Sequence, residues 1–176
     1  RLLASPHYGE RWARFWLDLA RYTDATASWL EGTGQAYLYR DWVTGAFNAD
    51  MPYNEFVKRQ LATDLMPETG PAETPALGFL GLSPTYWKEL QLPPEIIKVI
   101  VADEWEERID TVSRTFLGLT VACARCHDHK FDPITSKDYY ALAGVFASTR
   151  LAERPVIAES DYAIVKAAQG KVKKLN

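Results

Sequence analysis

The chain has 176 residues, of which 47% are apolar and 24% charged, so its length and composition are those of an ordinary globular domain. Its net charge of −3 argues against a nucleic-acid partner and against an anionic membrane surface. No apolar run approaches the roughly 18 residues of a membrane-spanning helix, and the sequence shows no signal peptide.

Apolar residues recur at helical spacing along the first half of the chain. Ser5 and Pro6 predict a helix start, with Ser5 as N-cap, and this helix should run to about Tyr22. Its predicted apolar face consists of Tyr8, Trp12, Phe15, Trp16 and Leu19. Residues 23–36 are rich in turn formers and predict a loop, and a second helix is expected over residues 37–48.

After a break at residues 50–52, a third helix is predicted to carry Phe56, Val57, Leu61 and Leu65. Prolines and a glycine between residues 67 and 75 mark the largest break, and residues 76–92 show no clear period. Pro93 and Pro94 open the longest predicted helix, which should end near Gly118. Its acidic residues, at 103–107, are expected on a solvated side of the helix.

Two further helices are predicted near the end of the chain. Ser136 is expected to cap the first, which carries Tyr139, Tyr140, Leu142, Val145 and Phe146. The second includes residues 162–172 and either packs loosely or leads into a further domain. The fold class is therefore mainly α, as an irregular multi-helix domain with long loops.

Residues 123–127 read Cys-Ala-Arg-Cys-His, which is the attachment signature of c-type haem. The two-residue gap puts the thiols of Cys123 and Cys126 on one side of a helical turn, where each can add to one vinyl group of the same haem. The adjacent His127 is then placed to bind the iron as the proximal ligand. Both cysteines of the chain lie within this motif.

Two other interpretations of the motif stay open. One is a disulfide between Cys123 and Cys126, although the βαβ context of a thioredoxin-like site is missing. The other is a metal site, but the only clustered sulfur and imidazole ligands are packed into seven residues that end at His129. A structural zinc site usually takes its ligands from two separated pairs.

Three stretches, residues 5–24, 39–67 and 116–146, resemble the cytochrome-c-like domain family of planctomycetes, found in large secreted bacterial proteins. The resemblance covers roughly residues 1–150 and implies one covalent haem c and an extracytoplasmic location, periplasmic or secreted. The usual family pattern has a His where this chain has Phe15, so position 15 supplies no axial ligand. We expect a haem domain over residues 1–150 and a helical extension or linker over residues 151–176.

The second axial ligand is harder to predict, because neither Met nor His follows His129 in the chain. This order is not that of the small class I cytochromes c. His7 ranks first and Met51 second as iron ligands, ahead of Met66, and a vacant sixth position is the alternative. The first helix, with Trp12 on its apolar face, is expected to cover the other side of the haem.

Charged residues flank the motif. Arg114, Arg125 and Lys130 are either propionate partners or solvated surface. His129 cannot reach the opposite face of the same haem, so it meets a propionate, another haem or ion, or solvent. The oxygens of Asp128 and Asp132 hold Ca²⁺, fix the His127 ring, or cap turns.

These observations predict an electron-transfer module rather than a catalyst. Its partners would be a redox protein or other haem domains, and further domains of the same parent protein, since the chain starts at Arg1 without Met. The alternatives are a structural or interaction module with a Cys123–Cys126 disulfide, and a haem enzyme or sensor with an open iron site.

Overall fold

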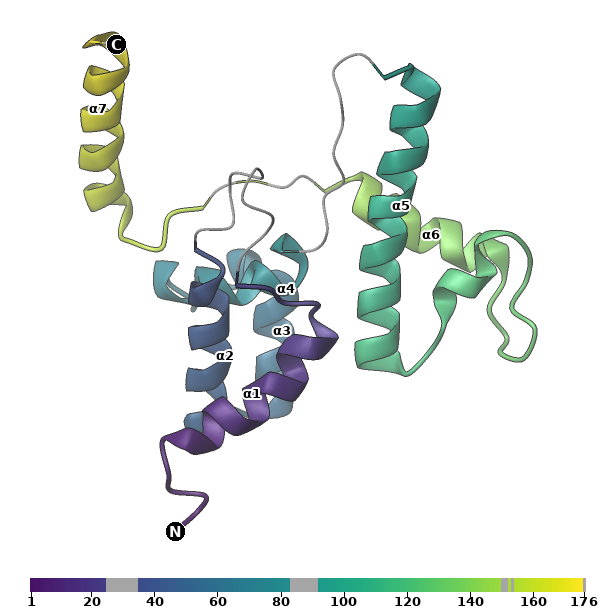
Figure 1. Cartoon of the computed structure of the whole chain (residues 1–176), viewed down its shortest axis with the longest axis horizontal. Coiled ribbons are helices and arrows are strands. Elements are labelled where there is room, and N and C mark those ends of the chain that lie inside the picture. Colours follow the sequence, from purple (N-terminus) through teal and green to yellow (C-terminus); the bar gives the residue numbers. More distant parts are fainter. Residues whose placement is uncertain (25–34, 83–91, 150–151, 153, 176) are drawn as a thin grey trace. The chain divides into compact units, whose positions relative to one another are not determined.

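The computed structural model describes residues 1–24, 35–82, 92–149, 152 and 154–175. Helices joined by irregular segments make up the fold, and no strand occurs within these ranges (Figure 1). The mainly α prediction is therefore confirmed. No helix in the described part of the chain is long and apolar enough to cross a membrane.

The chain divides into two compact units. The first unit consists of Arg1–Trp16, Thr23–Gly81 and Ala152–Asn176, and the second of Leu17–Tyr22 and Leu82–Leu151. Each is described by itself below.

The first unit contains α1 (His7–Leu19, whose last three residues belong to the second unit), α2 (Tyr37–Asn48), α3 (Tyr53–Ala62), α4 (Gly78–Gly81) and α7 (Glu159–Leu175). Two short 3₁₀ helices, η1 (Thr63–Leu65) and η2 (Pro71–Leu77), occupy the proline-rich region that the sequence predicts only as a break. The predicted bounds of α2 are confirmed at both ends. The predicted loop over residues 23–36 falls largely outside the described residues.

A hydrogen-bonded trio of side chains lies at the centre of the first unit. The indole Nε1–H of Trp16 donates to Gln60 Oε1 at 2.7 Å and to the Tyr39 hydroxyl at 3.1 Å, and that hydroxyl donates to Gln60 Oε1 at 2.7 Å. Burial raises the pKa of the Tyr39 hydroxyl, so it stays a neutral donor. The aromatic ring of Phe56 packs edge-on against Trp16.

The predicted apolar face of α1 is wrong in part. Trp16 is buried, but Trp12, Phe15 and Leu19 are each about half exposed. The buried side instead presents small residues, Gly9 and Ala13, beside Trp16. A small-residue face lets the backbone of α2 approach closely, which apolar spacing alone does not reveal. The helix also ends at Leu19 rather than Tyr22, before Arg21 adopts a left-handed conformation (φ 56°).

The second unit contains α5 (Pro94–Val112), the π-helical turn η3 (Ser113–Leu117), the 3₁₀ turn η4 (Val121–Arg125) and α6 (Ser136–Ala147). Gly118 ends the long helical segment with a left-handed conformation (φ 67°), as the sequence predicts. Its core joins the three elements through Ile109 from α5, Val121 and Ala124 from η4, and Tyr139 and Ala143 from α6. This packing fixes η4, and hence the Cys-Ala-Arg-Cys-His motif, against two helices.

The N-cap of α6 is Thr135, one residue before the predicted Ser136. The Thr135 hydroxyl and Asp138 form a reciprocal capping box, with Asp138 N donating to Thr135 Oγ1 at 3.2 Å and Thr135 N donating to Asp138 Oδ2 at 2.8 Å. These hydrogen bonds lower the pKa of Asp138.

The acidic side of α5 is not simply solvated. Glu104 is buried, and Arg21 donates to Asp110 at 2.8 Å and also pairs with Glu107. This side of the helix therefore holds part of the second unit together.

Candidate functional site

The motif lies on η4 and on the loop that follows it. Cys123 and Cys126 are free and exposed, while Val121 and Ala124 of the same turn are buried. Cys123 N donates to Thr120 O at 3.0 Å, as in a 3₁₀ turn. Residues three apart in a 3₁₀ helix lie on the same side, so the turn directs both thiols outward from a buried base.

His127 is exposed, and one of its ring nitrogens makes a hydrogen bond. Its Nδ1 lies 2.8 Å from the Asp128 carbonyl oxygen. A carbonyl oxygen only accepts, so Nδ1 carries the proton, and in the neutral ring Nε2 keeps its lone pair. Metal-binding histidines characteristically donate their other ring N–H in this way, because the bond fixes the tautomer and the ring orientation.

His129 has the opposite ring state. The backbone N–H groups of Asp132 and Phe131 donate to its Nδ1 at 2.9 and 3.2 Å. Asp132 Oδ2 lies 3.4 Å from the same nitrogen, but the two N–H donors define Nδ1 as an acceptor. Nε2 is therefore protonated and donates to Thr120 Oγ1 at 2.9 Å. The side chain is only 7% exposed, so the solvent-facing alternative is wrong.

Asp128 and Asp132 take part in the hydrogen bonds of the loop beside the motif in different ways. Asp128 Oδ1 accepts from Ser136 N at 2.8 Å, at the start of α6. The carbonyl of Asp132 accepts from Ile134 N at 2.7 Å, and His129 N donates to Ile134 O at 2.8 Å across the base of the loop. No group of three or more His, Cys, Asp or Glu side chains suited to a metal ion occurs among the described residues. The Asp128 carboxylate therefore fits the turn-capping interpretation, whereas Asp132 acts in the turn through its backbone carbonyl.

Arg125, inside the motif, points to α5. Its Nη1 donates to Asp103 Oδ1 at 2.8 Å and also pairs with Glu106. Hydrogen bonds to these two carboxylates raise the pKa of Arg125. Arg114 is similarly paired, with Nε 2.6 Å from Asp110 Oδ1. Both arginines bind carboxylates of the protein itself, and their role toward a haem propionate stays a prediction.

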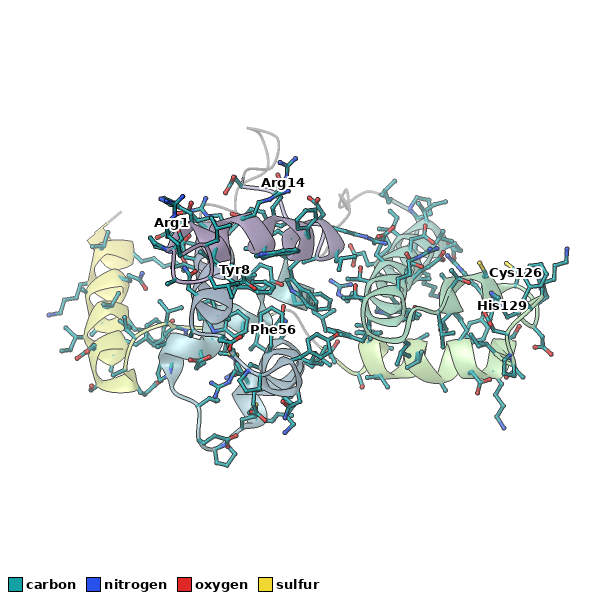
Figure 2. All side chains as sticks on the ribbon, turned by 90° about the horizontal axis from the view of Figure 1, so that it is seen from below. Arg1, Tyr8, Arg14, Phe56, Cys126 and His129 are labelled. Carbon is teal, nitrogen blue, oxygen red and sulfur yellow. The ribbon has the colours of Figure 1, made fainter. Side chains whose placement is uncertain are left out.

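Cys126 and His129 lie at the same end of the second unit (Figure 2). Val121 and Ala124, on the buried side of η4, pack in the hydrophobic core of the second unit. The hydroxyl of Tyr140, on α6, donates a hydrogen bond to Arg125 O at 3.2 Å. The sequence missed Thr120, Asp103 and Glu106 as supports of this site. They belong to no motif, and only the tertiary packing of η4 on α5 reveals them.

The predicted ligands outside the motif belong to the first unit. His7 is 77% exposed, with Nδ1 2.8 Å from Glu10 Oε2. Met51 is half-buried after α2, where its N–H donates to Ala46 O at 3.0 Å. Trp12 is exposed and stacks at a tilt on Phe15, with ring centroids 5.6 Å apart.

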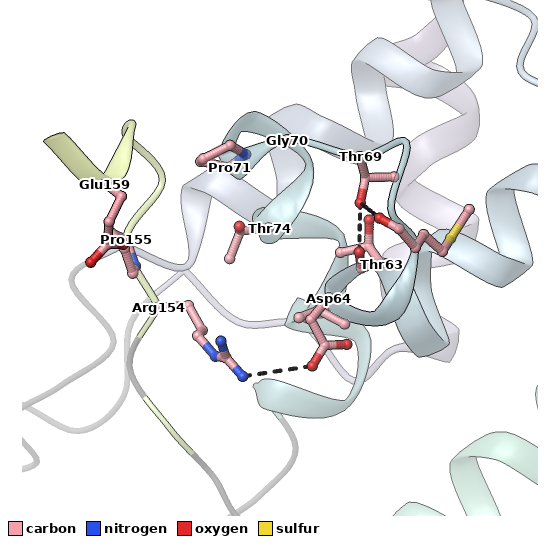
Figure 3. Close-up of a pocket in the computed structure, with 11 residues that line it drawn as sticks. Thr63, Asp64, Thr69, Gly70, Pro71, Thr74, Arg154, Pro155 and Glu159 are labelled. Atoms are coloured by element: carbon pink, nitrogen blue, oxygen red, sulfur yellow. Dashed lines mark hydrogen bonds and ion pairs between the residues drawn. The ribbon is translucent and has the colours of Figure 1, made fainter. Parts of the chain in front are cut away.

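Met66, the remaining candidate ligand, lines a half-open pocket of about 220 Å³ in the first unit (Figure 3). Arg154 lies 3.8 Å from Asp64 across this pocket, and the Thr69 hydroxyl donates to Thr63 O at 2.6 Å and to Met66 O at 2.8 Å. Polar and apolar residues both line this pocket, and none of its lining residues is a cysteine or a histidine.

Comparison with known proteins gives one result. Residues 1–151 match PSCyt2, described as a protein of unknown function (DUF1549), whose name suggests a planctomycete cytochrome-like domain. No curated protein and no solved structure matches the chain. Since the match extends over most of its length, and agrees with the resemblance seen in the sequence, the chain belongs to the PSCyt2 family.

Proposed function

We propose that this chain is a c-type cytochrome domain, which binds one haem covalently through Cys123 and Cys126 and uses His127 as an axial ligand. The observation that carries the proposal is the state of the motif: two free, exposed thiols three residues apart beside an imidazole whose Nε2 lone pair is available. When bound, the haem iron supplies a one-electron redox couple.

The residues present fit such a group. Addition of each thiol S–H across a haem vinyl group forms one C–S bond and moves the thiol proton to the neighbouring vinyl carbon, so no oxidant is needed. The Nδ1–H bond to the Asp128 carbonyl orients the His127 ring and fixes its tautomer, which leaves Nε2 as the available ligand atom. The turn supports both sulfurs on a rigid base, because Ala124 between them is fully buried.

Apolar cover for a haem is available within the second unit. Tyr140 is 60% exposed and its hydroxyl bonds to the Arg125 carbonyl, and Phe131 is 83% exposed and lies against the His129 ring. Large exposed apolar side chains in one region characteristically mark a binding surface. Lys130, whose ammonium lies 5.1 Å from the Phe131 ring centroid, is an exposed cation suited to a propionate.

The proposed role is electron transfer outside the cytoplasm, to a redox protein or to other haem domains. The family resemblance supports this location, because thioether formation in bacteria takes place on the far side of the inner membrane. The net charge of the chain is only −3, so long-range electrostatic steering of the partner would be weak. We expect apolar contacts around the haem edge to recognise the partner.

The test uses cysteine variants in cells that export the chain and assemble c-type haem. We expect wild type to retain haem through acid–acetone extraction and to give a pyridine haemochrome with both vinyl groups consumed. Cys126→Ser should keep haem through one thioether, which moves the haemochrome α band to longer wavelength. The double variant Cys123→Ser/Cys126→Ser should lose covalent haem altogether.

Lys137→Ser, on the exposed side of α6, is the control and should behave as wild type. Haem that extracts completely from wild type, or a Cys123–Cys126 disulfide found in the exported protein, would contradict the proposal and favour the disulfide module.

A further inference from the structure

We infer that His129 is a positioning residue, which holds His127 in register with the two cysteines and keeps the His127 ring in its Nδ1–H state. This inference rests on the proposed function. It concerns a side chain that the motif itself does not include, and it assigns a role to the buried imidazole of the site.

The first step is the contrast in burial along the loop. His129 is 7% exposed, whereas its neighbours Asp128 and Lys130 are exposed and Phe131 is 83% exposed. A buried polar ring in an otherwise exposed loop is stable only if its hydrogen-bonding groups are satisfied. Both ring nitrogens of His129 have partners, so the ring is a built-in part of the loop.

The hydrogen-bond partners of the His129 ring connect two separate parts of the backbone. Nδ1 of His129 accepts from two backbone N–H groups of its own loop, which closes the turn at Phe131 and Asp132. Nε2–H donates to Thr120 Oγ1 at 2.9 Å, on the residue that immediately precedes η4. The carbonyl of the same Thr120 accepts from Cys123 N at 3.0 Å. His129 therefore links the backbone that carries His127 to the backbone that carries Cys123.

The third step concerns His127. Its Nδ1–H bond ends on the Asp128 carbonyl, which is the peptide group that leads directly into His129. Rotation of that peptide would remove the acceptor from Nδ1. Four hydrogen bonds resist this rotation. Three are made by the His129 ring, and the fourth runs from the backbone N–H of His129 to Ile134 O. Loss of the link to Thr120 should therefore leave His127 without a fixed tautomer.

The experiment compares Thr120→Val with Thr120→Ser in the full chain. Valine has nearly the shape of threonine but no hydroxyl, and serine keeps the hydroxyl. In the haem-free chain, two-bond ¹H–¹⁵N spectra report the tautomer of each histidine directly. We expect His127 as Nδ1–H and His129 as Nε2–H in wild type and in Thr120→Ser, and loss of the single His127 tautomer in Thr120→Val.

The haem-loaded proteins give the second readout. Altering an outer-shell partner of a metal-binding histidine typically costs about 10–100-fold in affinity, so His127 should be displaced from iron roughly tenfold more readily in Thr120→Val. The amount of covalent haem should stay at the wild-type level. His129→Asn keeps an acceptor near the Nδ1 position but cannot donate to Thr120, and should behave as Thr120→Val.

The outcomes separate the two claims. Haem on all variants, with His127 unchanged in tautomer and in ligation in Thr120→Val and His129→Asn, would overturn the positioning role and leave the proposed function intact. A wild-type chain without covalent haem would overturn both. Far-ultraviolet circular dichroism of each variant checks that the helices persist, and the folded Thr120→Ser protein decides the comparison if His129→Asn fails to fold.

Discussion

Two histidines separated by one residue have different chemistry in this chain. His127 donates from Nδ1 to a carbonyl and keeps Nε2 free, whereas His129 accepts at Nδ1 and donates from Nε2. The sequence predicts His127 as the ligand from its place in the motif. It could not predict the role of His129, because that role depends on Thr120 and on two backbone N–H groups that only the folded loop brings near.

Arg125 shows the same limit. Its position inside the motif predicts a propionate partner, which stays a prediction, but does not predict its ion pairs with Asp103 and Glu106 of α5. The sequence contains both carboxylates, about twenty residues upstream, and offers no sign that η4 docks on that side of α5.

His7 is the first testable residue outside the motif. Its Nδ1 bonds to Glu10, and its side chain is 77% exposed, so the ring is accessible for binding to an iron atom. The prediction that His7 is the second axial ligand stays open to experiment. His7→Ala should convert a six-coordinate low-spin spectrum of the haem protein to a high-spin one, because the iron loses one imidazole.

Met51→Leu is the matched comparison and should leave that spectrum low-spin. An unchanged spectrum in His7→Ala would refute the His7 assignment, and a loss of low-spin character in Met51→Leu would transfer it to Met51. A high-spin wild-type spectrum would instead favour the open iron site.

At the scale of single elements, the helices were the most predictable feature. The apolar period and the flanking prolines and glycines located α2, α5 and the end at Gly118, because these signals act locally. The orientation of α1 was not predictable in the same way. The large apolar residues of α1 predict that their face is buried, but the face with the small residues Gly9 and Ala13 is buried as well. Which face is buried depends on packing against α2, and the sequence of α1 alone does not contain this information.

Gly9 gives a direct test of this packing. A Cβ at position 9 would lie 2.3 Å from Thr44 O and 2.8 Å from Asn48 Cγ. Backbone cannot move aside cheaply, so Gly9→Ala should lower the free energy of unfolding by about 1–3 kcal/mol. The measurement is urea unfolding followed by circular dichroism.

Gly45→Ala, on the exposed side of α2, is the control. No atom lies within 4 Å of its would-be Cβ, so the substitution should stabilise the helix by about 0.5–1 kcal/mol. If both variants are equally stable, the close approach of α1 to α2 is not present in solution.

The capping box of α6 predicts a pH dependence. Hydrogen bonds from Thr135 lower the pKa of Asp138 relative to its ordinary value near 4. A depressed carboxyl pKa contributes stability that is present above the ordinary pKa and is lost as pH falls through the folded value. Asp138→Asn removes the titrating carboxyl group. The free energy of unfolding of this variant should therefore fall less than that of wild type as the pH is lowered from neutral into the acid range.

The comparison uses urea midpoints of wild type and Asp138→Asn across the acid range. The two curves should differ at neutral pH and converge in acid. Parallel curves throughout would show that Asp138 does not contribute through its charge. Thr135→Ala, which removes the N-cap hydroxyl, should cost about 1 kcal/mol at neutral pH.

At the scale of the whole molecule, the chain consists of two compact units, and the motif belongs to the second. The sequence predicts one haem domain over residues 1–150, and the largest break that it shows, at residues 67–75, lies shortly before the boundary between Gly81 and Leu82. The predicted covering of the haem by α1 stays a prediction, as does the extent of the domain.

The second unit supplies the attachment residues but no methionine, and its two histidines are His127 and the fully bonded His129. The predicted axial ligands outside the motif, His7, Met51 and Met66, belong to the first unit.

Covalent haem is the central claim, and the intact mass of the denatured, exported chain tests it most directly. We expect a mass that exceeds that of the polypeptide by one haem, with no loss of haem on denaturation, and we expect this added mass to depend on the two cysteines. It should therefore disappear when Cys123 and Cys126 are both replaced by serine. A wild-type mass equal to that of the bare polypeptide, reduced or with two hydrogens lost to a disulfide, would contradict this claim.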